Sequence, residues 1–110
     1  MNSTGMIFVV DSSDRMRFKE AQSELAQVIQ DSHIHKNLVP VIVLANKQDV
    51  EGAVAVKTIQ TEMQLGEVLG EHPWTIHGIV ATRGDGVHEA MKKFAEMLKE
   101  DRRKKKKNLN

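Results

Sequence analysis

Three short apolar runs alternate with amphipathic stretches along this chain of 110 residues. The runs span Met6–Val10, Val41–Ala45 and Trp74–Val80, and polar or turn-forming residues follow each of them. Runs of this length predict strands, and the central one reads as buried on both faces, as in a parallel sheet. Apolar residues recur at helical spacing after each run, so we expect the order β-α-β-α-β-α with crossover helices.

The clearest helical pattern runs from Phe18 to Ile29, with charged residues between its apolar positions. A second helix is expected from Ala53 to about Leu65, and a third from Val87 to Leu98. Residues 33–37 are polar and are predicted to form a loop. Four of the six methionines are expected to fill the core rather than to form a binding patch; they are Met16, Met63, Met91 and Met97.

The net charge of +1 hides an asymmetry, because all fifteen acidic residues lie in 1–101 against ten basic ones, and six basic residues follow as Arg102–Lys107. We therefore expect one folded domain over residues 1–101 and a disordered basic tail over 102–110. The chain has no cysteine, which excludes disulfides and thiolate metal sites. His33 and His35 are the closest histidine pair, and they lack an obvious third ligand, so no metal site is predicted.

The residues after the central run can recognise a base. Asp49 accepts two parallel hydrogen bonds when ionised, which matches the two adjacent N–H donors of guanine and not the edge of adenine. Asn46 carries a donor and an acceptor, for the base or for pinning neighbouring loops, and the stem of Lys47 can lie along a ring face. The alternative is that Asn46 and Asp49 are ordinary turn and helix-cap residues.

Asn-Lys-Gln-Asp after an apolar strand resembles the guanine-specificity motif of small GTPases, and glutamine at its third position is typical of the Arf and Arf-like branch. The loop that begins at Ala81-Thr82 is similar to the branch's Cys-Ala-Thr-Ser-Gly-Asp-Gly loop, with Val80 in place of the cysteine and Arg83 in place of the serine. The stretch Thr4–Arg15 resembles the family's fourth strand and the turn after it.

This resemblance implies the second half of a P-loop-NTPase-like α/β domain, with three parallel strands and three crossover helices. It implies that GTP or GDP is held at its base by Asn46, Lys47, Asp49, Ala81 and Thr82, where the Ala81 N–H donates to the guanine carbonyl and Thr82 supports the loop. The family acts in vesicle trafficking, in the cytoplasm and at membrane surfaces, and its partners are exchange factors, activating proteins and effectors.

Several parts of the family's catalytic machinery have no counterpart in this sequence. There is no G-x-x-x-x-G-K-S/T, no threonine-bearing switch and no Asp-x-x-Gly-Gly-Gln, and position 2 is Asn rather than the glycine that is myristoylated. We therefore expect weak nucleotide binding without magnesium, and no hydrolysis by this chain alone.

The Met6–Val10 strand is expected to form a free apolar edge, and such edges recruit partners. This predicts a homo-oligomer through that edge, or a non-enzymatic interaction fragment that binds other partners there and no nucleotide. The basic tail has three interpretations: a solvated terminus, a contact with anionic membrane, or a site for nucleic acid or an import receptor.

Overall fold

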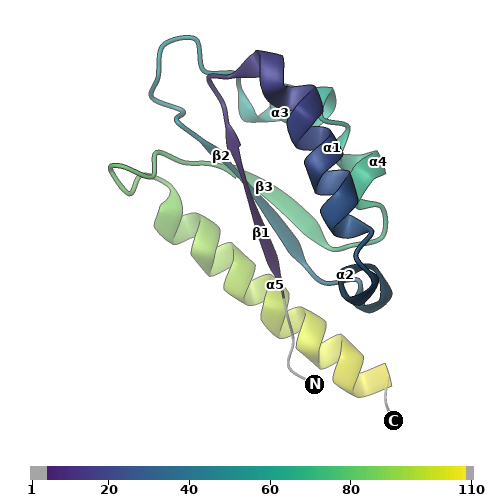
Figure 1. The fold of residues 1–110 in the computed structure, drawn as a ribbon. Helices are drawn as coiled ribbons and strands as arrows, with labels where there is room; N and C mark the ends of the chain where they lie inside the picture. Colours follow the sequence, from purple (N-terminus) through teal and green to yellow (C-terminus); the bar gives the residue numbers. More distant parts are fainter. Residues whose placement is uncertain (1–4, 109–110) are drawn as a thin grey trace.

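The chain folds around one parallel three-stranded sheet with the strand order β1-β2-β3 (Figure 1). The computed structural model describes residues 5–108. In chain order the elements are β1 (Met6–Asp11), the 3-10 helix η1 (Arg15–Arg17), α1 (Phe18–Ile29), α2 (Ser32–Asn37), β2 (Val41–Asn46), α3 (Val56–Glu62), α4 (Leu65–Leu69), β3 (Trp74–Gly78) and α5 (Val87–Asn108). The predicted α/β architecture with parallel strands is confirmed.

Helices cover both faces of the sheet, because β2 is apolar on both sides. Val41, Val43 and Ala45 belong to the larger core, which the sheet shares with α1, α3 and α4. Ile42 and Leu44 turn to the opposite face and pack in a smaller cluster with residues of α5. Figure 1 shows α5 on one side of the sheet and α1, α3 and α4 on the other, which gives three layers.

The turn between β3 and α5 lies close against the sheet. Gly86 has φ +77°, and a Cβ there would lie 2.6 Å from the Gly78 carbonyl oxygen. Only glycine combines this backbone conformation with so close an approach. The turn is therefore held at the carboxyl end of β3, and Ala81 is brought toward the residues that follow β2.

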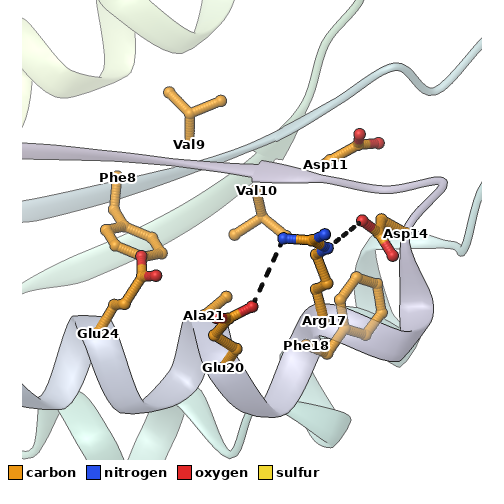
Figure 2. Close-up of a pocket in the computed structure, with 10 residues that line it drawn as sticks. All are labelled: Phe8, Val9, Val10, Asp11, Asp14, Arg17, Phe18, Glu20, Ala21 and Glu24. Atoms are coloured by element: carbon orange, nitrogen blue, oxygen red, sulfur yellow. Dashed lines mark ion pairs between the residues drawn. The ribbon is translucent and has the colours of Figure 1, made fainter.

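Strand β1 forms one edge of the described sheet, as predicted. Phe8 and Val10 point toward α1, whereas Val9 points to the opposite face (Figure 2). On that second face Ile7 is 48% exposed and Val9 is 56% exposed.

Residues 33–37, predicted as a loop, lie in the short helix α2 instead. The turn begins with a hydrogen bond from the His35 N–H to the Asp31 carbonyl, at 2.9 Å. It ends at Leu38, whose φ of +46° stops the helix. The polar residues of this segment predict only that it is exposed to solvent. A short surface helix is as exposed as a loop, so the polar pattern does not distinguish the two.

The second predicted helix is interrupted at Gln64, which has φ +50° and separates α3 from α4. Met63 and Leu65 are both fully buried. Residues two positions apart point to different sides of a continuous helix. The break lets both side chains enter the same core. Helical periodicity in the sequence does not predict such a break.

The basic segment 102–108 is helical, so the prediction of disorder from residue 102 onward is wrong for this part; residues 109–110 lie outside the described range. Two ion pairs link it to the acidic turn before it, Arg103 with Glu100 at 3.3 Å and Lys105 with Asp101 at 2.8 Å. Lysine and arginine are good helix formers, and cations suit a helix C-terminus.

Met16 is 96% exposed, so its predicted place in the core is wrong, whereas Met63 is fully buried. Met91 packs against the smaller core and Met97 is half-buried. Over residues 5–108, no helix is both long enough and apolar enough to cross a bilayer.

Candidate site at the carboxyl ends of the strands

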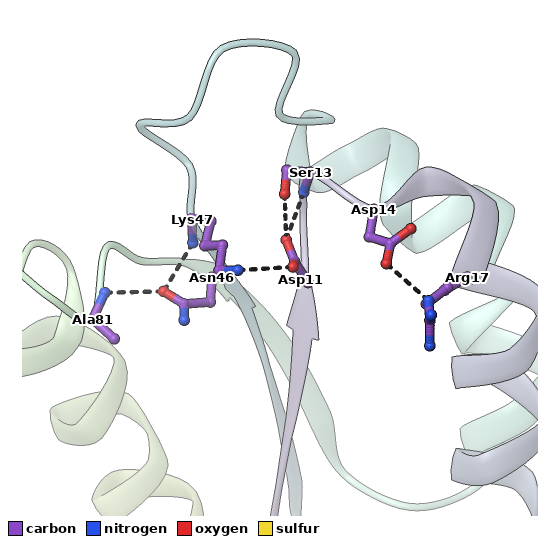
Figure 3. A network of polar contacts seen from close by, with 7 residues as sticks. All are labelled: Asp11, Ser13, Asp14, Arg17, Asn46, Lys47 and Ala81. Carbon is purple, nitrogen blue, oxygen red and sulfur yellow. Dashed lines mark hydrogen bonds and ion pairs between the residues drawn. The ribbon is translucent and has the colours of Figure 1, made fainter.

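Polar side chains gather where the three parallel strands end. Asp11 is the last residue of β1, Asn46 is the last residue of β2, and the two are partners in the strand register. Ala81 follows β3 in the turn that leads to α5 (Figure 3). The sheet therefore brings together three segments that lie far apart in the sequence, at the edge where open α/β folds bind ligands.

Asn46 joins the β2 and β3 ends through its side-chain oxygen. Its Oδ1 accepts the backbone N–H of Ala81 at 2.9 Å and that of Lys47 at 2.8 Å. The loop-pinning role that the sequence allowed for this residue is thus observed. The amide nitrogen Nδ2 has no hydrogen bond within residues 5–108, so it presents two free N–H donors.

The Ala81 N–H was expected to donate to a purine carbonyl, but in this structure it donates to Asn46. A ligand oxygen at that position must share the hydrogen or displace Asn46. Thr82 is exposed and makes no side-chain hydrogen bond within the described residues, and its support of the loop stays a prediction. The loop is closed instead by the Val80 N–H, which donates to the Asp85 carbonyl at 2.9 Å.

Lys47 reaches across the sheet end toward β1. Its φ is +66°, a conformation that costs a residue with a side chain about 1–2 kcal/mol. The Lys47 Nζ lies 3.0 Å from Asp11 Oδ2 (Figure 3). The Lys47 N–H donates to Oδ1 of the preceding Asn46, and this hydrogen bond helps to hold the Lys47 backbone in its left-handed conformation.

Asp11 is the most strongly perturbed acid of this site. The Ser13 hydroxyl donates to its Oδ1 at 2.6 Å, the Lys47 ammonium pairs with its Oδ2, and the Ser13 N–H donates at 2.9 Å. These contacts, the Ser13 hydroxyl first, lower the pKa of Asp11 from 3.8 to about 2. The carboxylate is therefore charged at any physiological pH and holds Lys47 in place.

Gln48 and Ser12 are structural members of the site that sequence reasoning missed. The Gln48 Nε2 donates to Ser12 Oγ at 2.8 Å and to the Val54 carbonyl at 3.1 Å, and the Ser12 hydroxyl is fully buried. The Gln48 N–H also donates to the Ile79 carbonyl at 3.2 Å. Gln48 thus ties all three strand ends together. The only sequence signal for Gln48 is its position inside the Asn-Lys-Gln-Asp motif.

Asp49 is exposed, and its carboxylate makes no hydrogen bond or ion pair within residues 5–108. A hollow of about 180 Å³ lies nearby, but it is bounded by β1 and α1 and is lined by neither Asp49 nor Ala81. This hollow therefore does not connect Asp49 with Ala81. Among the described residues, the site therefore offers an amide nitrogen and a carboxylate without partners, beside a lysine held by Asp11.

A parallel sheet covered by helices on both faces, with Asn-Lys-Gln-Asp at the end of its central strand, is the architecture of a P-loop GTPase-like half domain. The sequence profile of the ADP-ribosylation factor family matches residues 1–98. The chain belongs to that family.

Named relatives agree with this assignment. The chain is 37% identical over 99 residues to ADP-ribosylation factor-like protein 6 of Caenorhabditis elegans, an alignment that covers 89% of this chain and 52% of that protein. It is 36% identical over 94 residues to human ADP-ribosylation factor-like protein 4A, covering 86% of this chain and 46% of that protein. The chain therefore spans about half the length of the curated relatives it matches.

A solved structure shares the fold. The Arl6 BBS3 small GTPase from Trypanosoma brucei, solved with the bound nucleotide analogue GppNp, superposes with a TM-score of 0.85 at 31% identity. The match covers 88% of this chain and 59% of that one. The parallel sheet and the helices described above thus recur in a nucleotide-bound small GTPase.

Proposed function

We propose that this chain carries the base-recognition half of an Arf-like guanine-nucleotide-binding protein. The observation that carries the proposal is the state of Asn46, whose oxygen accepts two backbone N–H groups while its amide nitrogen has no hydrogen-bond partner in the part of the chain that the structure describes. An amide fixed in this way presents donors in one direction without further ordering cost. The family relationship and the nucleotide analogue bound to the Trypanosoma brucei relative support the same interpretation.

The free groups suit guanine. The Asn46 amide donates to an acceptor on the ring, and the Asp49 carboxylate accepts from the two adjacent N–H groups of the other edge. Lys47 offers its aliphatic stem to a ring face while Asp11 holds its ammonium. Ala81 shares its N–H with the carbonyl oxygen of the base, and Thr82 lies beside it in the same turn.

Binding by this chain alone is weak, and hydrolysis is absent. The sequence holds no G-x-x-x-x-G-K-S/T and no Asp-x-x-Gly-Gly-Gln. Phosphoryl transfer depends on the positioning and charge stabilisation that those segments supply, together with magnesium. A single-turnover assay with excess protein tests this: no phosphate release above buffer is expected, and release would overturn it.

Calorimetric titration with GDP and with ADP tests the base site. GDP is expected to bind more tightly, and Asp49→Asn is expected to reduce the preference by about tenfold, as for other paired base contacts. Lys57→Gln, in α3 and outside the candidate site, is the control and leaves the preference unchanged. Equal affinities of the unaltered chain for GDP and ADP would reject the proposal.

We also propose that the protein works in the cytoplasm and at anionic membrane surfaces, in vesicle trafficking, with exchange factors, activating proteins and effectors as its partners. The family relationship supports these partners, and the basic end of α5 supports the membrane contact, because Arg102, Arg103 and Lys104 are all exposed there. Each cation near an anionic surface contributes about 1 kcal/mol. Co-sedimentation with vesicles containing phosphatidylserine is expected, and salt should abolish it. Equal binding to neutral vesicles would contradict this contact.

The second candidate function is a non-enzymatic interaction module that works through the edge of β1, by pairing with a second copy or with another partner. The exposure of Ile7 and Val9 beside the unpaired strand favours it. Retention on GTP-agarose that guanine nucleotide releases and ATP does not would support the first function. Partner binding that is insensitive to both nucleotides would support the second.

A further inference from the structure

We propose that Gln48 is the positioning residue of the base site: it sets the direction of the Asp49 carboxylate, and thereby the discrimination between guanine and purines that lack its amino group. This role deepens the proposed function and rests on it. Three features of the structure point to it: the turn that contains both residues, the hydrogen bonds of the Gln48 side chain, and the close packing of its stem.

Gln48 and Asp49 occupy the two central positions of one β-turn. The Val50 N–H donates to the Lys47 carbonyl at 3.1 Å, which closes a four-residue turn. Gln48 is half-buried in this turn, whereas Lys47 and Asp49 on either side of it are exposed. The two central residues of a hydrogen-bonded turn have defined backbone directions relative to each other. Holding Gln48 in place therefore also holds the backbone that carries Asp49.

All three N–H groups of Gln48 have acceptors, and these acceptors lie on three different segments. The backbone N–H donates to the Ile79 carbonyl at 3.2 Å. The side-chain Nε2 donates to Ser12 Oγ at 2.8 Å, just after β1, and to the Val54 carbonyl at 3.1 Å, beyond the turn. An amide nitrogen carries two hydrogens, so these two contacts use both of them. Gln48 therefore has no donor left for a ligand and acts through its neighbour.

Ser12 and Val54 are themselves joined, which fixes the loop at both of its ends. The Val54 N–H donates to the Ser12 carbonyl at 2.8 Å, beside the two side-chain contacts of Gln48. Ser12 is fully buried, so water does not take the place of the amide there. The loop over residues 48–54 is thus attached through its first and last residues to one residue after β1. Asp49 lies in this loop, next to the anchored Gln48.

The stem of Gln48 packs closely against β3. A Cβ built on Gly78 would lie 3.1 Å from Gln48 Cγ and 3.5 Å from its Cδ. Carbon atoms in ordinary contact lie about 3.5–4.0 Å apart, so glycine at this position leaves the room that the stem occupies. Packing and hydrogen bonds therefore confine the same side chain.

Other side chains at position 48 do not reproduce these contacts. Leucine has a similar size but no donor, which leaves the Val54 carbonyl without its amide partner. Glutamate places an ionised oxygen, which only accepts, against that carbonyl. Asp49 is exposed and has no partner of its own within residues 5–108. Its direction therefore depends on the anchored turn.

The chemistry of guanine makes this direction measurable. A carboxylate that recognises guanine accepts from two adjacent N–H groups at once, one on the ring and one on the amino group. Hypoxanthine, the base of IDP, keeps the ring N–H and lacks the amino group. A misdirected Asp49 loses the second contact, so the ratio of the affinities for GDP and IDP falls. A purely structural defect lowers both affinities by the same factor and leaves this ratio unchanged.

Calorimetric titration of the full chain with GDP and with IDP tests the role. The unaltered chain is expected to bind GDP about tenfold more tightly than IDP, as for other paired base contacts. Gln48→Leu is expected to reduce this ratio to about twofold or less, because the paired contact is lost. Ser12→Ala removes one acceptor of the same amide and is expected to lower the ratio in the same direction. Gln60→Leu, at an exposed position of α3, is the matched control and keeps the ratio.

A double variant separates action through Asp49 from any direct effect. Asp49→Asn removes the acceptor that Gln48 is proposed to direct. Gln48→Leu added to Asp49→Asn should therefore leave the ratio of GDP to IDP affinity where Asp49→Asn alone puts it. A further fall of the ratio in the double variant would overturn the positioning role.

Amide hydrogen exchange reads the loop without any nucleotide. Gln48→Leu is expected to speed exchange of the Val54 N–H by about tenfold, because the loop opens locally more often. Gln60→Leu should leave that rate unchanged, and an unchanged rate in Gln48→Leu would overturn the anchoring. If Gln48→Leu fails to fold, Ser12→Ala carries both measurements, and a normal ratio with a normal exchange rate would then overturn the role.

Failure of the base site and failure of the positioning role give different results. Equal affinities of the unaltered chain for GDP and ADP would overturn the base site and the role of Gln48 with it. A preference of the unaltered chain for GDP, together with a Gln48→Leu chain that keeps the full ratio of GDP to IDP affinity, would overturn the positioning role alone.

Discussion

Lys47 and Asp11 form an ion pair across the carboxyl ends of two adjacent strands, with Nζ 3.0 Å from Oδ2. The motif lysine has a left-handed backbone conformation, with φ +66°, and its half-exposed side chain is directed toward the end of β1. The pair also adds the carboxylate of Asp11, on β1, to the site. The sequence had predicted site residues only after β2 and in the β3–α5 turn. Opposite charges therefore link the carboxyl ends of β1 and β2.

Asp11→Asn is expected to lower the free energy of unfolding at neutral pH by up to about 1 kcal/mol, since the pair is partly exposed. The folded pKa of about 2 lies below the ordinary 3.8, so this stabilisation is present well above pH 3.8 and disappears as the pH falls toward 2. Urea unfolding of both proteins across this range measures the difference. Asp49→Asn is the control, and a constant difference between pH 7 and 2 would contradict the linkage.

Asn46 allows the structural and the ligand-binding roles to be separated. Asn46→Asp keeps an oxygen for the N–H groups of Ala81 and Lys47 but loses the free amide. It should change stability by less than about 1 kcal/mol and weaken the binding of GDP, because the ring acceptor of the base loses its donor. Asn46→Ala removes the acceptor as well and is expected to cost about 1–3 kcal/mol in urea unfolding. If the two variants are equally stable, the loop-pinning role is wrong.

His72 anchors the start of β2 from the loop that precedes β3. It is 4% exposed, and its Nδ1 lies 2.9 Å from the Val39 carbonyl oxygen, so the ring donates through Nδ1–H. His72→Phe leaves that carbonyl unpaired and is expected to lower the free energy of unfolding by about 1–3 kcal/mol. His88→Phe, at an exposed position of α5, is the matched control. Equal stability of the two variants would contradict the anchoring role.

The sequence predicted the sheet well, because short apolar runs leave few alternatives to buried parallel strands. It located Asn46, Lys47, Asp49 and Ala81 at one edge for the same reason, since parallel strands end together. It did not predict that Asn46 takes up the Ala81 N–H, because that contact depends on how closely the Gly86 turn approaches β3. Nor did it identify Gln48 and Ser12, whose hydrogen bond joins residues 36 positions apart.

The break between α3 and α4 yields the last prediction, because Gln64 holds a left-handed conformation that glycine adopts without strain. Its side chain accepts one exposed hydrogen bond from Gln22 Nε2 at 3.1 Å. The loss of this exposed hydrogen bond destabilises the fold less than the relief of backbone strain stabilises it. Gln64→Gly is therefore expected to raise the free energy of unfolding by about 0.5–1 kcal/mol. Gln64→Ala loses the same bond without the relief and should be slightly destabilising. Thermal unfolding compares the two variants. If Gln64→Gly is no more stable than Gln64→Ala, backbone strain at this break does not limit the stability of the α3–α4 segment.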